Sequence, residues 1–283
     1  MAKIPGMNRE KAEQILSRKT PDFVARKYNE EFVIHEEQIQ NYRKNGFLKM
    51  EKVFEGETLR FIKEIVEAAV YLRKESDERE LKDKSAYQQS FLQCGFLAFD
   101  FAVIKELVLS KRLGSISRSL LEVEHVRLWH DQALFKEPNG RVTDVHVDSS
   151  YWPVSNPLKS GTIWLALNDV PKEKGCLYFY PESQNYKREY VDIFNSPHTP
   201  EFIKDNEKIF VPLKAGDITF HSGLTYHGAG ENKSSEIREG MTVIYISDGN
   251  KFTTVDERNA THKSCINLKD GDVINTIYTP IVI

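Results

Sequence analysis

The pattern of hydrophobic and polar residues changes near Glu124, and before that point it predicts helices. In Glu57–Glu75 the apolar residues recur at helical spacing and give an amphipathic helix. In His35–Asn45 they recur in the same way, and the following Gly46 is a residue that commonly ends a helix. A loose helix or arm is expected at Asn8–Arg18. Two further helices are predicted at Phe101–Leu109 and Leu113–Leu121.

From Glu124 onward the predicted elements are short strands. The segments are rich in aromatic and β-branched residues, and turns with Pro, Gly and Asn separate them. The candidate strands are Glu124–Asp131, Asp144–Asp148, Thr162–Asn168, Leu177–Tyr180, Lys208–Pro212, Ile218–His221, Thr225–His227 and Met241–Ser247. Many short strands at this spacing indicate a sandwich or barrel instead of alternating βαβ units. The fold class is therefore predicted to be mainly β, with flanking helices.

The 283 residues are expected to form one domain. Residues 1–121 would be a mostly helical flank, residues 122–250 the β core, and residues 251–283 a C-terminal extension. The first helices are expected to pack on the outside of the β core and not to form a domain of their own.

Composition argues against several classes of protein. The formal net charge is −3 and the basic residues are scattered, which is not typical of a nucleic-acid-binding protein. No apolar run reaches the roughly 18 residues of a membrane span, and the first residues lack the apolar segment of a secretory signal. The three cysteines are far apart, with no CxxC pair, so neither a disulfide framework nor a zinc ribbon is predicted. A reducing, cytoplasmic setting is expected.

Two histidines, one carboxylate and one arginine form the strongest chemical pattern. His146 and Asp148 lie two residues apart, so on a strand both side chains point to one face. His227, from a distant strand, would complete a set of two imidazoles and one carboxylate. Such a set leaves one face of a metal ion open, which suits a non-haem Fe(II) oxygenase. Arg238 could hold a dicarboxylate cosubstrate through a two-pronged salt bridge.

Several blocks of sequence, taken in order, resemble the phytanoyl-CoA dioxygenase family of Fe(II)/2-oxoglutarate oxygenases. The opening helix and strand of the family are similar to HEEQIQNYRKNGFLKMEKVF, and the strand before its metal motif is similar to WHDQALFKEPNG. The metal motif itself resembles HVDSSYWP. The central block resembles GTIWLALNDVPKEKGCLYFYPESQ, and the closing block resembles AGDITFHSGLTYHGAGENKSSEIR. The resemblance spans roughly residues 35–250 and implies a double-stranded β-helix, the jelly-roll core that cupins share.

The resemblance also implies the cofactors and their ligands. His146, Asp148 and His227 would bind Fe(II), and Arg238 would bind 2-oxoglutarate, with O₂ as the second cosubstrate. Many relatives have a serine two residues after the distal histidine, where this chain has Ala229. One hydrogen bond to the cosubstrate is therefore not expected here.

Other residues around the motifs have a structural interpretation beside the functional one. Trp164 and Gln132 fall where the family often lines the cosubstrate pocket, although Trp164 also suits a core. Tyr151 and Trp152, next to the metal motif, would border the substrate or stabilise their loop. His221 competes with His227 as the distal ligand, and is expected instead to orient a ligand by a hydrogen bond or simply to end a strand.

Three further features have no assigned contact with the iron. His130 is expected to be structural or to support the site from behind, and His262 is expected to be exposed. The long irregular stretch Tyr186–Phe202 is interpreted as a lid or as a passive insertion.

The predicted activity is oxidation of a small-molecule metabolite, with release of succinate and CO₂. In related halogenases a small residue replaces the carboxylate, so the presence of Asp148 implies hydroxylation or a related oxidation such as desaturation. No basic cluster stands out for the phosphates of CoA. Two alternatives are a non-catalytic jelly-roll protein that binds a metal and a cupin-type metalloenzyme that does not use 2-oxoglutarate. The substrate and the oligomeric state are left open.

Overall fold

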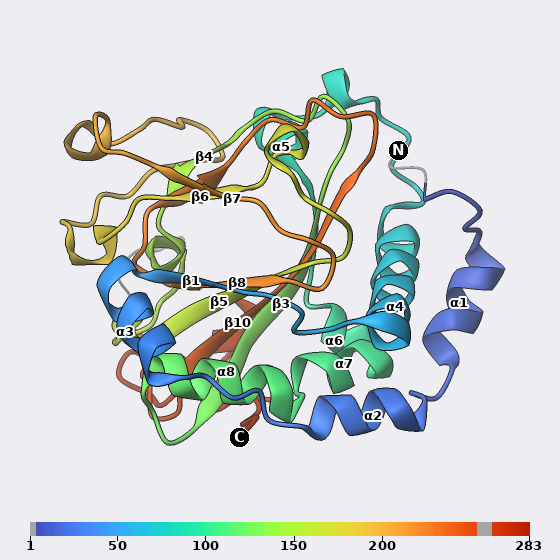
Figure 1. The fold of residues 1–283 in the computed structure, drawn as a ribbon, viewed down its shortest axis with the longest axis horizontal. Coiled ribbons are helices and arrows are strands. Elements are labelled where there is room, and N and C mark those ends of the chain that lie inside the picture. The colour runs from blue at the N-terminus through green and yellow to red at the C-terminus, as the bar shows by residue number, and fades with distance from the viewer. Residues whose placement is uncertain (1–3, 254–261) are drawn as a thin grey trace.

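Two antiparallel sheets facing each other form the centre of the protein (Figure 1). The structure is a computed structural model that describes residues 4–253 and 262–283. The larger sheet has the strand order β1-β8-β5-β10-β3-β2, and the smaller has the order β4-β9-β6-β7. The strands are β1 (Phe47–Met50), β2 (Leu92–Gly95), β3 (Val126–Lys136), β4 (Thr143–His146), β5 (Ser160–Ala166), β6 (Leu177–Phe179), β7 (Ile209–Val211), β8 (Ile218–Ser222), β9 (His227–Ala229) and β10 (Arg238–Ser247). The sheets do not close on each other, and the predicted mainly β class is confirmed.

Helices pack against the outer face of the larger sheet (Figure 1). They are α1 (Arg9–Ser17), α2 (Asp22–Asn29), α3 (Glu36–Asn45), α4 (Gly56–Lys74), α6 (Leu97–Asp100), α7 (Ala102–Val108) and α8 (Lys111–Leu121). The short α5 (Ala86–Ser90) lies apart from this layer, beside the edge strand β2. The apolar face of α4, with Ile62 and Ile65, belongs to the same buried cluster as Leu165 and Val243 of the sheet. Burial of this face explains why the helical periodicity was readable in the sequence. Within the described ranges, no helix is long and apolar enough to cross a bilayer.

The end of α3 is fixed by backbone geometry and by contacts to a distant strand. Gly46 has a φ of +78° and donates its N–H to the carbonyl of Tyr42, as predicted for a glycine that ends a helix. A Cβ at this position would lie 2.3 Å from Gln184 Oε1 and 2.4 Å from Thr225 Oγ1. The carbonyl of Gly46 in turn accepts hydrogen bonds from Ser222 N at 2.9 Å and from Thr225 Oγ1 at 2.8 Å. The helix end is thereby tied to the segment that leads into β9.

Two strands of the larger sheet come from the part of the chain expected to be mostly helical. β1 pairs with β8, and β2 pairs with β3 as the edge strand. β3 and β10 are also longer than predicted, since β3 continues to Lys136 and β10 begins at Arg238. The longer pairing places Lys136 and Arg238 directly opposite each other across the two strands.

The residues after 261 return to the sheet and line one side of β3. Val126 N donates to the carbonyl of Ile283 at 3.1 Å, and Leu128 N donates to that of Pro280 at 3.1 Å. Ser264 Oγ donates to the carbonyl of Trp129 at 2.6 Å. This part of the C-terminal extension is therefore packed on the β core.

Candidate metal centre and its cavity

His146, Asp148 and His227 come together at one end of the smaller sheet. His146 ends β4 and His227 begins β9, and the two residues are paired across these strands. One potential ligand atom from each of the three side chains lies within 4.8 Å of the others. The predicted strand Asp144–Asp148 is wrong at its end, because Asp148 already begins a 3₁₀ turn. The intervening Val147 is still extended, so the alternation of side chains brings Asp148 to the side of His146.

Backbone carbonyls determine which nitrogen of each imidazole carries the proton. His146 Nδ1 lies 2.8 Å from the carbonyl oxygen of Asp144, and His227 Nδ1 lies 3.0 Å from that of Thr225. A carbonyl only accepts, so each Nδ1 is the N–H donor and each Nε2 holds a free lone pair. These Nε2 atoms face Asp148 Oδ1 at 3.4 Å and 3.7 Å. Three electron-pair donors that share no proton are the arrangement a metal cation satisfies.

The second oxygen of Asp148 is held by other side chains. Oδ2 accepts a hydrogen bond from Thr162 Oγ1 at 2.7 Å and lies 3.1 Å from His221 Nε2. Burial opposes ionisation, but His227, His146 and His221 together hold the pKa of Asp148 well below its ordinary value. Burial and the neighbouring imidazoles of His221 and His146 hold the pKa of His227 well below its ordinary value. The carboxylate is therefore charged, with Oδ1 left for a metal.

The position of His221 bears on which histidine is the distal ligand. Its Nε2 faces Asp148 Oδ2 and not the space between the three ligand atoms. This geometry favours His227 as the ligand and fits the predicted orienting role of His221.

We expect Thr162→Val to weaken metal binding by about tenfold, because valine keeps the shape but cannot donate to Asp148. Calorimetric titration with Mn(II) measures the change. Thr242→Val is the matched control, since Thr242 lines the same cavity but donates to the carbonyl of Gln132. An equal loss in both variants would contradict the role of Thr162.

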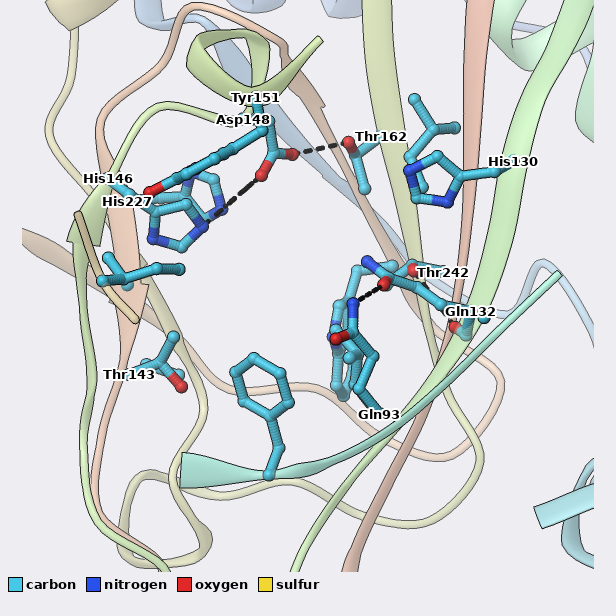
Figure 2. A pocket seen from close by; sticks show the side chains of 18 of the residues that line it. Gln93, His130, Gln132, Thr143, His146, Asp148, Tyr151, Thr162, His227 and Thr242 are labelled. Atoms are coloured by element: carbon cyan, nitrogen blue, oxygen red, sulfur yellow. Dashed lines mark hydrogen bonds and ion pairs between the residues drawn. The ribbon is translucent and has the colours of Figure 1, made fainter. Parts of the chain in front are cut away.

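A cavity of about 290 Å³ opens beside the three ligand atoms, between the two sheets. Figure 2 shows His146, Asp148 and His227 on one side of it and Gln93, Gln132 and Thr242 on the other. The other residues singled out in the sequence also line it: Arg238, Trp164, Tyr151, Trp152 and His221. The structure thus brings all nine candidate site residues to one cavity, while their individual roles stay predictions.

Arg238 is a buried cation without an anionic partner in the described part of the chain. The residue is 1% exposed, and its Nη1 donates to the carbonyl of Gly175 at 2.8 Å. Its Nε and the indole Nε1 of Trp164 are both buried and have no hydrogen-bond acceptor among the residues that the structure describes. Burial lowers the pKa of Arg238 to about 10, so the group is still charged at neutral pH. Unpaired buried donors of this kind mark a binding position for an anion.

Lys136, which the sequence analysis did not identify, lies beside Arg238. The side chain is fully buried, and among the described residues its acceptors are all uncharged: the carbonyl of Gly230 at 2.8 Å, the carbonyl of Arg141 at 2.5 Å and Thr143 Oγ1 at 3.3 Å. Burial first, and then the charge of Arg238, hold its pKa well below the ordinary lysine value. A lysine at a strand end looks exposed in a sequence, and only the register of β3 against β10 would have revealed it.

A chain of hydrogen bonds on the opposite wall was also missed. Tyr87 Oη donates to Gln93 Oε1 at 2.9 Å, and Gln93 Nε2 donates to Gln132 Oε1. Gln93 lies on β2, an edge strand of only four residues that gave no readable periodicity. Tyr87 thus orients the amide of Gln93, which in turn orients the amide of Gln132, the predicted cosubstrate residue.

The segment Tyr186–Phe202 reaches the cavity through Ile193 and Phe194. Tyr151 Oη donates to the carbonyl of Val191, and the rings of Tyr151 and Phe194 are 5.8 Å apart. The interpretation of this segment as a lid stays a prediction. His262, expected to be exposed, is instead half-buried and stacks on Trp129 with ring centroids 4.5 Å apart.

Comparison with known proteins decides the family. The profile described as "Phytanoyl-CoA dioxygenase (PhyH)" matches residues 42–240, which include the three candidate ligands and Arg238. The chain belongs to the phytanoyl-CoA dioxygenase family. A curated relative is the probable alpha-ketoglutarate-dependent hypophosphite dioxygenase of Stutzerimonas stutzeri, 24% identical over 227 residues, which covers 75% of this chain and 78% of that protein.

Similar solved structures support the fold. The non-haem alpha-ketoglutarate-dependent carbocyclase SnoK from nogalamycin biosynthesis has a TM-score of 0.73 at 24% identity, covering 88% of this chain and 97% of that one. The epimerase SnoN, solved with Fe³⁺, alpha-ketoglutarate and nogalamycin RO, has a TM-score of 0.72 at 23% identity and covers 87% and 98%. The predicted jelly-roll core and the predicted enzyme class, a dioxygenase that depends on iron and 2-oxoglutarate, are confirmed.

Proposed function

We propose that this family member oxidises a C–H bond of a small molecule, with His146, Asp148 and His227 as iron ligands and Arg238 as the anchor of 2-oxoglutarate. The observation that carries the proposal is the position of two complementary features in one cavity. The first is the set of lone pairs that His146, Asp148 and His227 direct at one point with no proton between them. The second is the buried guanidinium of Arg238, which has no anionic partner among the described residues.

The residues present fit both groups. When bound, ferrous iron with 2-oxoglutarate and O₂ supplies the oxidising power that turns a C–H bond into an alcohol and yields succinate and CO₂. The chain supplies position: Asp144 and Thr225 carbonyls orient the imidazoles, and Thr162 and His221 orient the carboxylate.

The cosubstrate would lie between the ligand triad and the buried guanidinium of Arg238. Arg238 would pair with its far carboxylate, the planar match that favours arginine over lysine at such sites. Trp164, whose ring lies 5.3 Å from Arg238 Cζ, would form a wall, and Gln132 would contribute its amide.

Neither alternative explains Arg238. A protein that binds metal only for structure, or a cupin-type enzyme without 2-oxoglutarate, would leave this cation buried at a cost and without a purpose. Hydroxylation is the expected outcome because the carboxylate ligand is present. We place the reaction in a reducing, cytoplasmic setting, on the evidence that all three cysteines are free.

The test is consumption of 2-oxoglutarate by the purified protein. With Fe(II) and O₂, we expect succinate and CO₂ to form slowly without substrate and faster with it. Chelation should stop the reaction and Fe(II) should restore it. Binding of metal without any binding of 2-oxoglutarate would favour the cupin-type alternative, and binding of neither would refute the proposal.

A further inference from the structure

One end of the cavity is built from aromatic rings of segments far apart in the chain. Phe96, His130, Trp152 and His262 all line this end, which we name the aromatic end. The ring centroid of His130 lies 5.3 Å from His262, 5.5 Å from Phe96 and 6.5 Å from Trp152. His262 lies outside residues 42–240, the part of the chain that matches the family. The chemistry of this end is therefore set partly by residues beyond the family match.

The two histidines of the aromatic end are uncharged. No carboxylate of the described residues forms an ion pair with either ring, and burial lowers the pKa of His130 to about 4 and that of His262 to about 3. His262 Nδ1 accepts the N–H of Ser264 at 3.3 Å, so its proton lies on Nε2. His130 Nδ1 is buried and has no hydrogen-bond partner in the described part of the chain. The aromatic end thus combines flat apolar walls with hydrogen-bonding groups that carry no charge.

The remaining cavity lining offers nothing to balance a charged substrate. Among the described lining residues, the one carboxylate is Asp148 and the one arginine or lysine is Arg238, and the proposed function assigns them to iron and to 2-oxoglutarate. The polar side chains on the wall opposite the ligand triad are the amides of Gln93 and Gln132 and the hydroxyls of Tyr87 and Thr242. An ionised substrate would lose its hydration here without gaining a counter-charge.

The size of the cavity indicates a small substrate. About 290 Å³ is at the small end of ligand pockets and must also hold the cosubstrate. Aromatic side chains favour stacked or edge-on contact with another ring.

We propose that the aromatic end binds the substrate, and that the substrate is an uncharged, ring-bearing small molecule with an oxygen group that hydrogen-bonds to His130 and His262. This inference rests on the proposed function for the location of the iron and the cosubstrate. The proposed specificity distinguishes this protein from enzymes that act on phosphorus oxyanions, such as the relative named for hypophosphite, and from enzymes that act on acyl-CoA.

The test compares probes of one shape and different charge. Calorimetric titration of the Mn(II)- and 2-oxoglutarate-loaded protein without O₂ would use 2-naphthol, 2-naphthoate and hypophosphite. We expect 2-naphthol to bind at least about tenfold more tightly than 2-naphthoate, and hypophosphite to give no binding heat. Tighter binding of either anion, equal binding of the two naphthalene probes, or no binding of 2-naphthol would overturn the inference.

Variants locate the binding site. His130→Phe and His262→Phe keep a ring and remove the imidazole nitrogens, so each is expected to weaken 2-naphthol binding about fivefold, the effect of one lost hydrogen bond. His125→Phe makes the same change on an exposed residue outside the cavity and should bind 2-naphthol like the unchanged protein. Unchanged binding in both cavity variants, or an equal loss in His125→Phe, would refute this location.

The same samples distinguish a failure of the proposed function from a failure of the proposed substrate class. If 2-oxoglutarate fails to bind the metal-loaded protein, the proposed function is wrong. If 2-oxoglutarate binds normally but the probes do not follow the expected order, only the substrate class is wrong.

Discussion

Replacing Asp148 by alanine is expected to abolish succinate formation. The variant keeps two imidazoles but loses the only anionic group among the three candidate ligands. Loss of a residue that merely orients a ligand costs 10- to 100-fold in metal affinity, so loss of a ligand itself should exceed about 100-fold. The substitution also removes the acceptor of Thr162 and His221, which then have no group to orient. Titration with Fe(II) in the absence of O₂, and succinate production, measure the two effects.

Asp169→Ala is the control for this experiment. Asp169 is exposed and pairs with Lys214 at 2.8 Å, outside the cavity. Both variants should retain the far-ultraviolet circular dichroism of the unchanged protein, since neither residue belongs to an apolar core cluster. Retained succinate formation in Asp148→Ala would remove the carboxylate from the proposed ligand set.

Replacing Arg238 by methionine is expected to raise the KM for 2-oxoglutarate by at least about 100-fold. Breaking a buried ion pair costs about 3–5 kcal/mol, and about 3 kcal/mol corresponds to a factor of roughly 150 in affinity. Without cosubstrate, however, the guanidinium is a buried charge with no described counter-ion, and methionine fills similar space without that desolvation cost. The Tm of the free protein should therefore be unchanged or higher. Steady-state kinetics and thermal unfolding test the two halves of this prediction.

Thermal unfolding with and without 2-oxoglutarate distinguishes the unchanged protein from Arg238→Met more directly than the Tm of the free protein does. For the unchanged, Mn(II)-loaded protein, 2-oxoglutarate at 100 times its Kd should add about 2.7 kcal/mol of stability, and for Arg238→Met this gain should disappear. Arg112→Met is the matched control, because Arg112 is also buried but donates to the carbonyl of Val53 away from the cavity. It should lower the Tm and preserve the response to 2-oxoglutarate. A preserved response in Arg238→Met would assign the cosubstrate carboxylate to another residue.

The sequence predicted those parts of the site that depend on residue type and spacing. Two histidines and an aspartate have few uses together, and Arg238 was associated with them by its spacing from His227, which matches the place of the 2-oxoglutarate arginine in the family that the chain resembles. The helix that ends at Gly46 was predictable for a similar reason, because the glycine has a local role that its neighbours reveal.

Features that depend on burial and register were not predictable. Lys136 is a polar residue that looks exposed in the sequence, and only the register of β3 against β10 shows that it is buried opposite Arg238. Gln93 lies on a strand of four residues, too short to show alternation. His262 lies in a polar stretch, and its role arises because the segment folds back on Trp129, 133 residues earlier in the sequence. Long-range contacts of this kind leave no local pattern.

The contacts of Gly46 have a consequence for how the protein can evolve. The carbonyl of Thr225 accepts the hydrogen bond of His227 Nδ1, and its hydroxyl donates to the carbonyl of Gly46, so one residue joins the helix end to a proposed iron ligand. Any side chain at position 46 would collide with that hydroxyl and displace the residue that orients the imidazole. The choice of residue in this buried turn is therefore limited by the proposed metal centre as well as by the end of the helix, and we expect variants at position 46 to lose iron loading together with local stability.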